Sequence, residues 1–269
     1  MALCLPLAES LVSSCMALLL RGLPPAVAPV RASRTASRLL AEPLPRGRGP
    51  RGTRQVCAAT LASPPPQKRV LVPIATGSEE IETACIVDIL RRAGADVTVA
   101  SCNPDQSLIV KMSRGMNFLA DAAVTACADN LYHLIALPGG MPGASGLAAS
   151  PVLHALLKAQ AARGAPYAAM CAAPAVVLEP AGLLTGKAAT AHPAFVEKLG
   201  ERREAVDARV VVDGNCITSR GPGTALEFSL ALVQVLFGPD KAAEVAKPLV
   251  LQPTAASTQL LPHEWRLAQ

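Results

Sequence analysis

Apolar residues along this chain fall into short continuous runs separated by segments with helical spacing. Continuous apolar runs of strand length, bounded by turn residues, are typical of strands that are buried on both faces. The expected strands are residues 68–75, 96–100, 108–110, 117–119, 133–137, the run that ends at Cys171, and a further strand around Ala188. Strands of this kind predict a mostly parallel sheet.

Between these runs, apolar residues recur with helical spacing. The first helix is expected to begin at the acids of residues 79–82 and to end at Ala93, before Gly94. The other expected helices are residues 151–163, 174–181, 193–199 and 224–237. Strands that alternate with helices predict an α/β fold in which helices cover both faces of the sheet. Residues 68–251 are sufficient for one such domain.

The first sixty residues differ in composition from the rest. They contain eight Arg, no Lys and only two acids, Glu9 and Glu42, among many Ser, Pro and Ala. This composition is typical of an organelle transit peptide, with a chloroplast as the first choice and a mitochondrion as the second. The alternative is a disordered tail. We therefore expect a transit peptide over residues 1–60, a linker over 61–67 and a loose C-terminal tail over 252–269.

The net charge of +5 arises from this leader. Of the chain's 25 basic and 20 acidic residues, eight Arg and two Glu lie in residues 1–60, so the remainder carries 17 and 18. A nearly neutral domain without basic runs disfavours nucleic acid as a partner. The apolar stretch of residues 11–20 is too short to span a membrane.

The cysteines beyond the leader are odd in number and lack metal-site spacing. They are Cys85, Cys102, Cys127, Cys171 and Cys216. A disulfide framework or a zinc site is therefore not expected. No nucleotide-binding glycine motif occurs, so we expect neither a metal nor another cofactor.

Cys171 is the cysteine whose position indicates chemistry. It lies where the apolar run 167–171 meets the start of a helix. A thiol at a helix N-terminus faces unpaired N–H groups, and we therefore expect its pKa to fall toward or below neutrality. The alternative is an inert core cysteine.

Several polar segments follow strands and are expected at one edge of the sheet. They are the acids of residues 79–82, Gly139 and Gly140, Cys171, and His192. Ligands of open α/β sheets gather at the carboxyl ends of the strands, so this edge is the expected site.

Six ordered stretches resemble the DJ-1/PfpI family of the class I glutamine amidotransferase-like superfamily. They are residues 77–82, 88–94, 137–140, 168–174, 192–193 and 219–224. The resemblance implies a flavodoxin-like three-layer sandwich, a homodimer, and a nucleophile elbow with a carboxyl group beside the cysteine sulfur. Cys171 is then the nucleophile and Glu82 its partner. With the leader, the chain resembles a plant plastid member reduced from two tandem domains to one.

The remaining site residues follow from this resemblance and the local chemistry. The backbone N–H groups of Gly139, Gly140 and Ala172 are expected to stabilise an oxyanion, and His192 to transfer a proton. Arg114 matches a family position near the partner's cysteine pocket. The peptidase-like relatives carry His where this chain has Ala172, which disfavours peptidase activity. Family members often have Gly at the position of Ala173, and the added methyl group is expected to narrow the pocket.

The leading functional hypothesis is a cofactor-free, glutathione-independent glyoxalase of the D-lactate dehydratase class. It would convert methylglyoxal or glyoxal to a 2-hydroxy acid and act on early glycation adducts as a deglycase. The alternative is a redox-sensing chaperone in which Cys171 is the oxidisable thiol. A third possibility is a folded but inactive single-domain remnant.

Overall fold

The computed structural model describes residues 67–205, 208–251 and 266–267, and of residues 201–205 and 266–267 the backbone alone. The predicted transit peptide, residues 61–66 of the predicted linker and most of the predicted tail lie outside the described residues, so these assignments stay predictions. Among the described helices, none is both long and apolar enough to cross a membrane.

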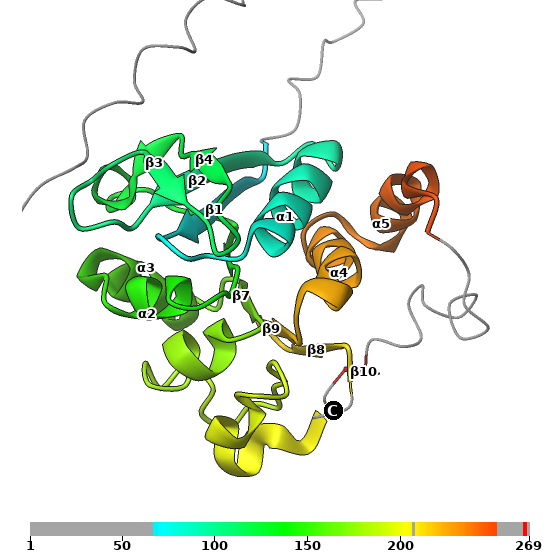
Figure 1. The fold of residues 1–269 in the computed structure, drawn as a ribbon. Coiled ribbons are helices and arrows are strands. Elements are labelled where there is room, and N and C mark those ends of the chain that lie inside the picture. The colour runs from blue at the N-terminus through cyan, green and yellow to red at the C-terminus, as the bar shows by residue number, and fades with distance from the viewer. Residues whose placement is uncertain (1–66, 206–207, 252–265, 268–269) are drawn as a thin grey trace, which may run out of the picture. The chain divides into compact units, whose positions relative to one another are not determined.

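An eight-stranded sheet forms the centre of the fold, in the order β10-β8-β9-β7-β6-β1-β2-β5 (Figure 1). Neighbouring strands pair in parallel, except that β8 and β9 are antiparallel. The strands are β1 Arg69–Ile74, β2 Asp96–Ser101, β5 Ala122–Ala123, β6 Leu134–Leu137, β7 Tyr167–Met170, β8 Val210–Asp213, β9 Cys216–Ser219 and β10 Arg266–Leu267. A separate antiparallel pair consists of β3 Ile109–Lys111 and β4 Asn117–Leu119.

Helices cover both faces of the sheet (Figure 1). The α-helices are α1 Glu80–Arg92, α2 Gly143–Ala148, α3 Pro151–Ala162, α4 Ala225–Phe237 and α5 Pro239–Ala246. Short 3-10 helices span Val124–Cys127, Val196–Ala205, Pro222–Thr224 and Lys247–Leu249, and a π-helical turn spans Pro174–Leu178.

Two hydrophobic cores, one on each face of the sheet, explain this layering. Along β1, Val70 and Val72 pack with residues of α1, α4 and α5, whereas Leu71 packs with residues of α2 and α3. Successive side chains of a strand point to opposite faces, so a continuous apolar strand supplies both cores at once. The predicted flavodoxin-like three-layer fold is confirmed.

The predicted strand around Ala188 is wrong. The N–H of Ala188 donates to Asp213 Oδ2 at 2.8 Å, and the N–H of Thr190 donates to Thr218 Oγ1 at 2.9 Å. Side chains thus satisfy backbone groups that would otherwise need a strand partner.

Other local differences concern the C-terminal half. The hairpin of β8 and β9 was not predicted, although Gly214, with φ +58°, lies in its short turn and is a typical hairpin signal. The helices expected over 174–181 and 193–199 are a π-helical turn and a 3-10 helix. Residues 266 and 267, predicted to be loose, pair with β8.

Candidate active site

The carboxyl ends of four adjacent strands bring the candidate residues together. The strands β9, β7, β6 and β1 are neighbours in the sheet. Ser219 ends β9, Cys171 follows β7, Gly139 follows β6, and Glu82 lies in the first turn of α1 after β1. Hydrogen bonds described below link all four segments, so the predicted convergence at this edge of the sheet is confirmed.

Cys171 forms a strained elbow between β7 and the following π-helical turn. Its φ is +61°, in the left-handed region that costs a non-glycine residue about 1–2 kcal/mol. Two hydrogen bonds hold this conformation: the Cys171 N–H donates to the Ser219 carbonyl at 3.0 Å, and the His192 N–H donates to the Cys171 carbonyl at 2.8 Å. The side chain of Cys171 is buried except for a small exposed fraction, 8% of the residue surface.

Glu82 is fully buried beside this elbow. Its Oε2 accepts a 2.7 Å hydrogen bond from the Gly139 N–H. Its Oε1 is buried and has no hydrogen-bond partner among the described residues, and the Cys171 thiol lies close enough for the two groups to shift each other's pKa. The carboxylate of Glu79 fixes the turn by accepting from the Glu82 N–H at 2.7 Å. The predicted pairing of Glu82 with Cys171 is therefore present in the structure.

Burial sets the protonation of this pair. It raises the pKa of Glu82 to about 7, against a smaller lowering by the Gly139 and Cys171 hydrogen bonds. Burial, followed by the charge of Glu82, raises the pKa of Cys171 to about 12, while the Gly140 and Ala172 N–H groups lower it. Around neutrality the pair therefore loses one of its two protons, and because the pKa of Glu82 is the lower, the remaining proton stays mainly on the Cys171 sulfur. The thiolate forms when this proton passes to Glu82.

The expectation of a pKa near or below neutrality for the Cys171 thiol is thus corrected. The helix start was expected to stabilise the thiolate, but the segment after the elbow is a five-residue π-helical turn. Few peptide dipoles align over so short a turn, and desolvation and the adjacent carboxylate outweigh them.

The prediction for the oxyanion donors is corrected at one residue. The N–H of Gly139 is engaged by Glu82, whereas the N–H groups of Gly140 and Ala172 face the Cys171 sulfur. Gly139 has a steric role instead, since a Cβ there would lie 2.6 Å from the Cys171 Cβ. The Ala173 methyl group is fully buried in the core on the α2 and α3 side.

His192 is hydrogen-bonded to the Cys171 elbow, whereas Arg114 is hydrogen-bonded to Glu80 on α1. His192 is attached to the elbow by its backbone, and its Nδ1 accepts from the Ala194 N–H at 3.1 Å, which places the ring proton of the neutral form on Nε2. The Arg114 N–H donates to Glu80 Oε1 at 2.6 Å, and its side chain is exposed. The Arg114 side chain donates to the Ser113 carbonyl, and no contact with Cys171 within one chain is seen among the described residues.

The carbonyl of Ser219 is a functional group that the sequence did not reveal. The stretch 219–224 suggested only a turn and a helix cap, and a backbone acceptor leaves no trace in side-chain chemistry. Among the described residues, no group of three or more His, Cys, Asp or Glu side chains could hold a metal ion.

A mostly parallel α/β sandwich with a cysteine on a strained elbow and a buried carboxyl group beside it defines a class of α/β proteins built around that cysteine. The model of the DJ-1/PfpI family matches residues 68–235. The chain belongs to the DJ-1/PfpI family.

Individual relatives agree with this assignment. Protein DJ-1 homolog B of Arabidopsis thaliana is 49% identical over 179 residues, which cover 66% of this chain and 40% of that protein. Glutathione-independent glyoxalase DJR-1.2 of Caenorhabditis elegans is 37% identical over 175 residues, covering 65% and 91%. The solved structure described as Toxoplasma gondii DJ-1, oxidized, has a TM-score of 0.67 and 44% identity, covering 69% of this chain and 100% of that one. The chain spans less than half the length of the two Arabidopsis relatives.

The stability of the fold is expected to depend on the proton of Glu82. The pKa of this carboxyl is about 7 in the folded protein and 4.5 in ordinary surroundings, so its contribution to stability is complete below about pH 4.5 and is lost as the pH rises through 7. We expect the free energy of unfolding, relative to a Glu82→Gln variant, to fall by about 3 kcal/mol between pH 4.5 and 8. Urea unfolding of both proteins across this range measures the difference, and parallel pH curves would contradict it.

Proposed function

We propose that this protein is a cofactor-free, glutathione-independent glyoxalase that converts methylglyoxal or glyoxal to a 2-hydroxy acid. The observation that carries the proposal is the arrangement around the Cys171 sulfur, where a buried carboxyl group and two backbone N–H groups meet. A nucleophile, a proton carrier and donors for an oxyanion are the groups that aldehyde rearrangement requires. The similarity to a relative named as a glutathione-independent glyoxalase supports it.

The reaction begins when the Cys171 thiolate adds to the aldehyde carbon and forms a hemithioacetal. The new oxyanion lies within reach of the Gly140 and Ala172 N–H groups and takes the proton from Glu82. The hydrogen on the aldehyde carbon is then removed as a proton and returned to the neighbouring carbonyl carbon through an enediol. This transfer leaves a thioester of the 2-hydroxy acid. Water hydrolyses the thioester, releases the acid and restores the thiol, so the net reaction adds one water molecule.

Glu82 is the best-suited proton carrier in this sequence of steps. A pKa of about 7 allows a carboxyl group both to give and to accept a proton near neutral pH. His192, attached to the elbow through its backbone, is the second group for the transfer between the two carbon atoms. An early glycation adduct contains the same type of carbonyl group, so deglycase activity would use the same residues.

The test is the formation of D-lactate from methylglyoxal by the full chain without glutathione. We expect saturable turnover that added glutathione does not raise, and a loss of about 10²–10⁴-fold in kcat for Glu82→Gln, which cannot carry the proton. Circular dichroism would show that the variant is folded. If the wild-type protein gives no lactate, the proposal fails.

A redox-sensing role is the second candidate, and the same geometry favours it. The N–H groups of Gly140 and Ala172 could equally donate hydrogen bonds to the oxygens of an oxidised sulfur, with protonated Glu82 donating to one of them. The similar Toxoplasma gondii protein is described in an oxidized form. Mass spectrometry after treatment with hydrogen peroxide would show a sulfinic acid at Cys171 without lactate turnover if this role is the correct one.

We further propose that the protein forms a homodimer through an exposed apolar surface, which we call the hairpin surface. It consists of Ile81 on α1, Ile109 and Leu119 on the paired strands β3 and β4, and Met116 in the turn between them, each more than half exposed. Glu80 joins α1 to this turn through Ser113 Oγ and the Arg114 N–H, both at 2.6 Å. A contiguous apolar surface of this kind marks a protein interface. Such an interface would bring Arg114 close to the partner subunit.

Leu119→Asp is expected to give a monomer, because it places a charge in the centre of the hairpin surface. Light scattering after size-exclusion chromatography gives the mass. A matched change at Leu131→Asp, which is equally exposed but lies elsewhere, is expected to leave the mass unchanged. A wild-type protein that is already monomeric would contradict the assignment.

A further inference from the structure

The end of β9 is attached to both Cys171 and the segment that carries His192. The Ser219 carbonyl accepts the Cys171 N–H at 3.0 Å. One residue earlier, Thr218 Oγ1 accepts from the Thr190 N–H, two residues before His192. Gly221 lies against the imidazole, since a Cβ at this glycine would be 3.4 Å from His192 Cδ2. The position of this strand end therefore determines where the elbow and the imidazole lie.

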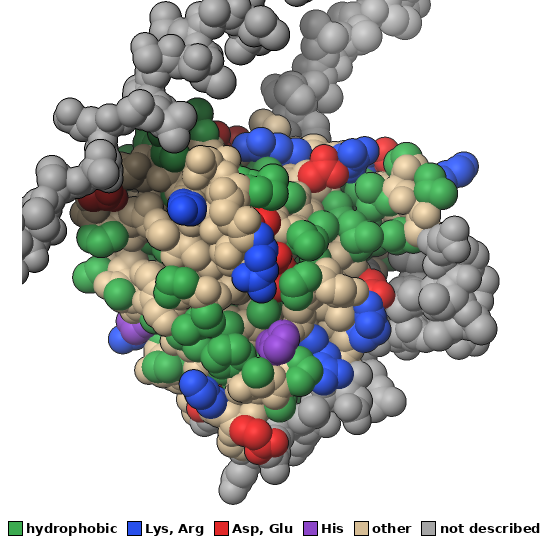
Figure 2. All heavy atoms as spheres, in the orientation of Figure 1, with side chains coloured by type: hydrophobic (Ala, Val, Ile, Leu, Met, Phe, Trp, Pro, Cys, Tyr) green, Lys and Arg blue, Asp and Glu red, His purple; other side chains and the backbone are tan. Residues whose placement is uncertain are grey.

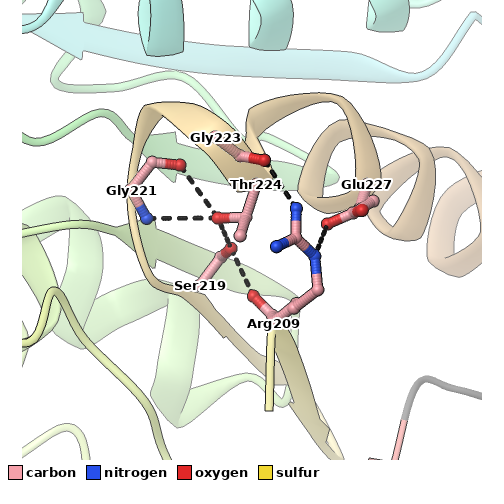
Figure 3. A network of polar contacts seen from close by, with 6 residues as sticks. All are labelled: Arg209, Ser219, Gly221, Gly223, Thr224 and Glu227. Carbon is pink, nitrogen blue, oxygen red and sulfur yellow. Dashed lines mark hydrogen bonds and ion pairs between the residues drawn. The ribbon is translucent and has the colours of Figure 1, made fainter. Parts of the chain in front are cut away.

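Two buried hydroxyl groups hold the strand end in place, as Figure 3 shows. Ser219 Oγ donates to the Arg209 carbonyl at 2.7 Å and lies 2.7 Å from Thr224 Oγ1. Thr224 Oγ1 lies 3.1 Å from the Gly221 nitrogen and 2.9 Å from its carbonyl oxygen, and so closes the turn on itself. Ser219 is fully buried and Thr224 nearly so. Buried hydrogen bonds of this kind fix a single geometry, because leaving any partner unsatisfied is costly.

Arg209, whose carbonyl accepts from Ser219 Oγ, also forms an ion pair at the surface. Arg209 Nε donates to Glu227 Oε2 at 2.7 Å, and its Nη2 donates to the Gly223 carbonyl at 2.6 Å (Figure 3). Half of the Arg209 side chain is exposed, so the ion pair by itself contributes little. The two contacts of Arg209 join the start of β8 to the turn that contains Gly223 and to the first turn of α4.

We propose that Ser219 and Thr224 are positioning residues, whose hydroxyl groups keep Cys171 in its reactive backbone conformation through the Ser219 carbonyl. If that carbonyl is displaced, the elbow loses one of the two hydrogen bonds that hold it in the left-handed region, and the backbone relaxes toward ordinary φ values. Relaxation moves the sulfur away from the Gly140 and Ala172 N–H groups, which stabilise the thiolate. The proposal rests on the proposed function only in taking Cys171 as the reactive group.

The test compares Thr224→Val, which keeps the shape and loses the hydroxyl, with Thr224→Ser, which keeps the hydroxyl. The rate of Cys171 alkylation by iodoacetamide is measured by mass spectrometry against pH in the full chain, a readout that requires no aldehyde turnover. For Thr224→Val we expect the rate at pH 7 to fall about tenfold, because the thiolate is then less stabilised relative to the thiol. Thr224→Ser is expected to retain the wild-type profile.

Two further variants keep the test decisive. Arg209→Gln removes only the side-chain contacts with Glu227 and Gly223 and is expected to lower the rate at pH 7 by a smaller factor. Asp88→Asn breaks a similar ion pair, Asp88 with Arg92 at 2.6 Å on α1, and is expected to leave the profile unchanged.

The proposal is overturned if a folded Thr224→Val protein has the wild-type profile, or if the Thr224→Val and Thr224→Ser variants change the profile equally. If Thr224→Val does not fold, an unchanged profile for Arg209→Gln overturns it. Altered alkylation without lactate formation in the wild type supports the positioning role and rejects the glyoxalase.

Discussion

Replacement of Cys171 by serine is expected to lower the rate of lactate formation from methylglyoxal by about 10⁴-fold or more. Serine keeps the shape of the side chain but not its chemistry, because a hydroxyl group is far harder to deprotonate than a thiol. Initial rates at saturating methylglyoxal give the value.

The control for this substitution is Cys85→Ser. Cys85 is half-buried on α1, and we expect its replacement to leave turnover unchanged. Circular dichroism of the Cys171→Ser protein would show that the fold survives. Residual turnover within tenfold of the wild type would assign the chemistry to another residue.

Gly140→Ala is expected to reduce the free energy of unfolding by about 2–5 kcal/mol and to remove the reactivity of Cys171. The φ of Gly140 is +85°, which penalises a side chain by about 1–2 kcal/mol. A Cβ would also lie 2.5 Å from the Glu79 nitrogen and 2.6 Å from the Gly77 carbonyl oxygen, which are backbone atoms that cannot move aside easily. Overpacking of this kind adds about 1–3 kcal/mol. Relief of the clash would displace the Gly140 N–H from the sulfur.

Gly164→Ala separates the two contributions. Gly164 has a similar φ of +71°, but no heavy atom lies within 4 Å of its Cβ position, so only the conformational cost of about 1–2 kcal/mol is expected. Urea unfolding measures both variants, and alkylation of Cys171 reports the reactivity. Equal losses of stability at the two glycines would show that the close approach of residues 77–79 to Gly140 is not rigid.

The fold was largely accessible from the sequence because its central strands are buried on both faces. Runs such as residues 68–75 and 133–137 have no polar alternation and are followed by helical patterns, which leaves few arrangements other than a covered parallel sheet. Apolar segments whose backbone groups bond to side chains are harder to distinguish from strands. The apolar run around Ala188 resembles a strand, yet Asp213 and Thr218 satisfy its backbone.

The residues that form the site could be predicted from the sequence, but their pKa values could not. The position of Cys171 after an apolar run, and of Glu82 and Gly140 after other runs, indicated that they would meet. The pKa values could not be inferred, because they depend on the depth of burial and on which oxygen of Glu82 lacks a partner. For the same reason, the engagement of the Gly139 N–H by Glu82 required coordinates.

Most of the groups around the Cys171 sulfur and backbone belong to the main chain: the N–H groups of Gly140, Ala172 and His192, and the Ser219 carbonyl. A point mutation cannot delete a main-chain group; it can only displace it. The capacity to stabilise charge at this cysteine is thus set by the path of the backbone and does not depend on the identity of any one side chain around it. Engineering of a new specificity here should therefore change side chains around the elbow and leave its backbone path intact.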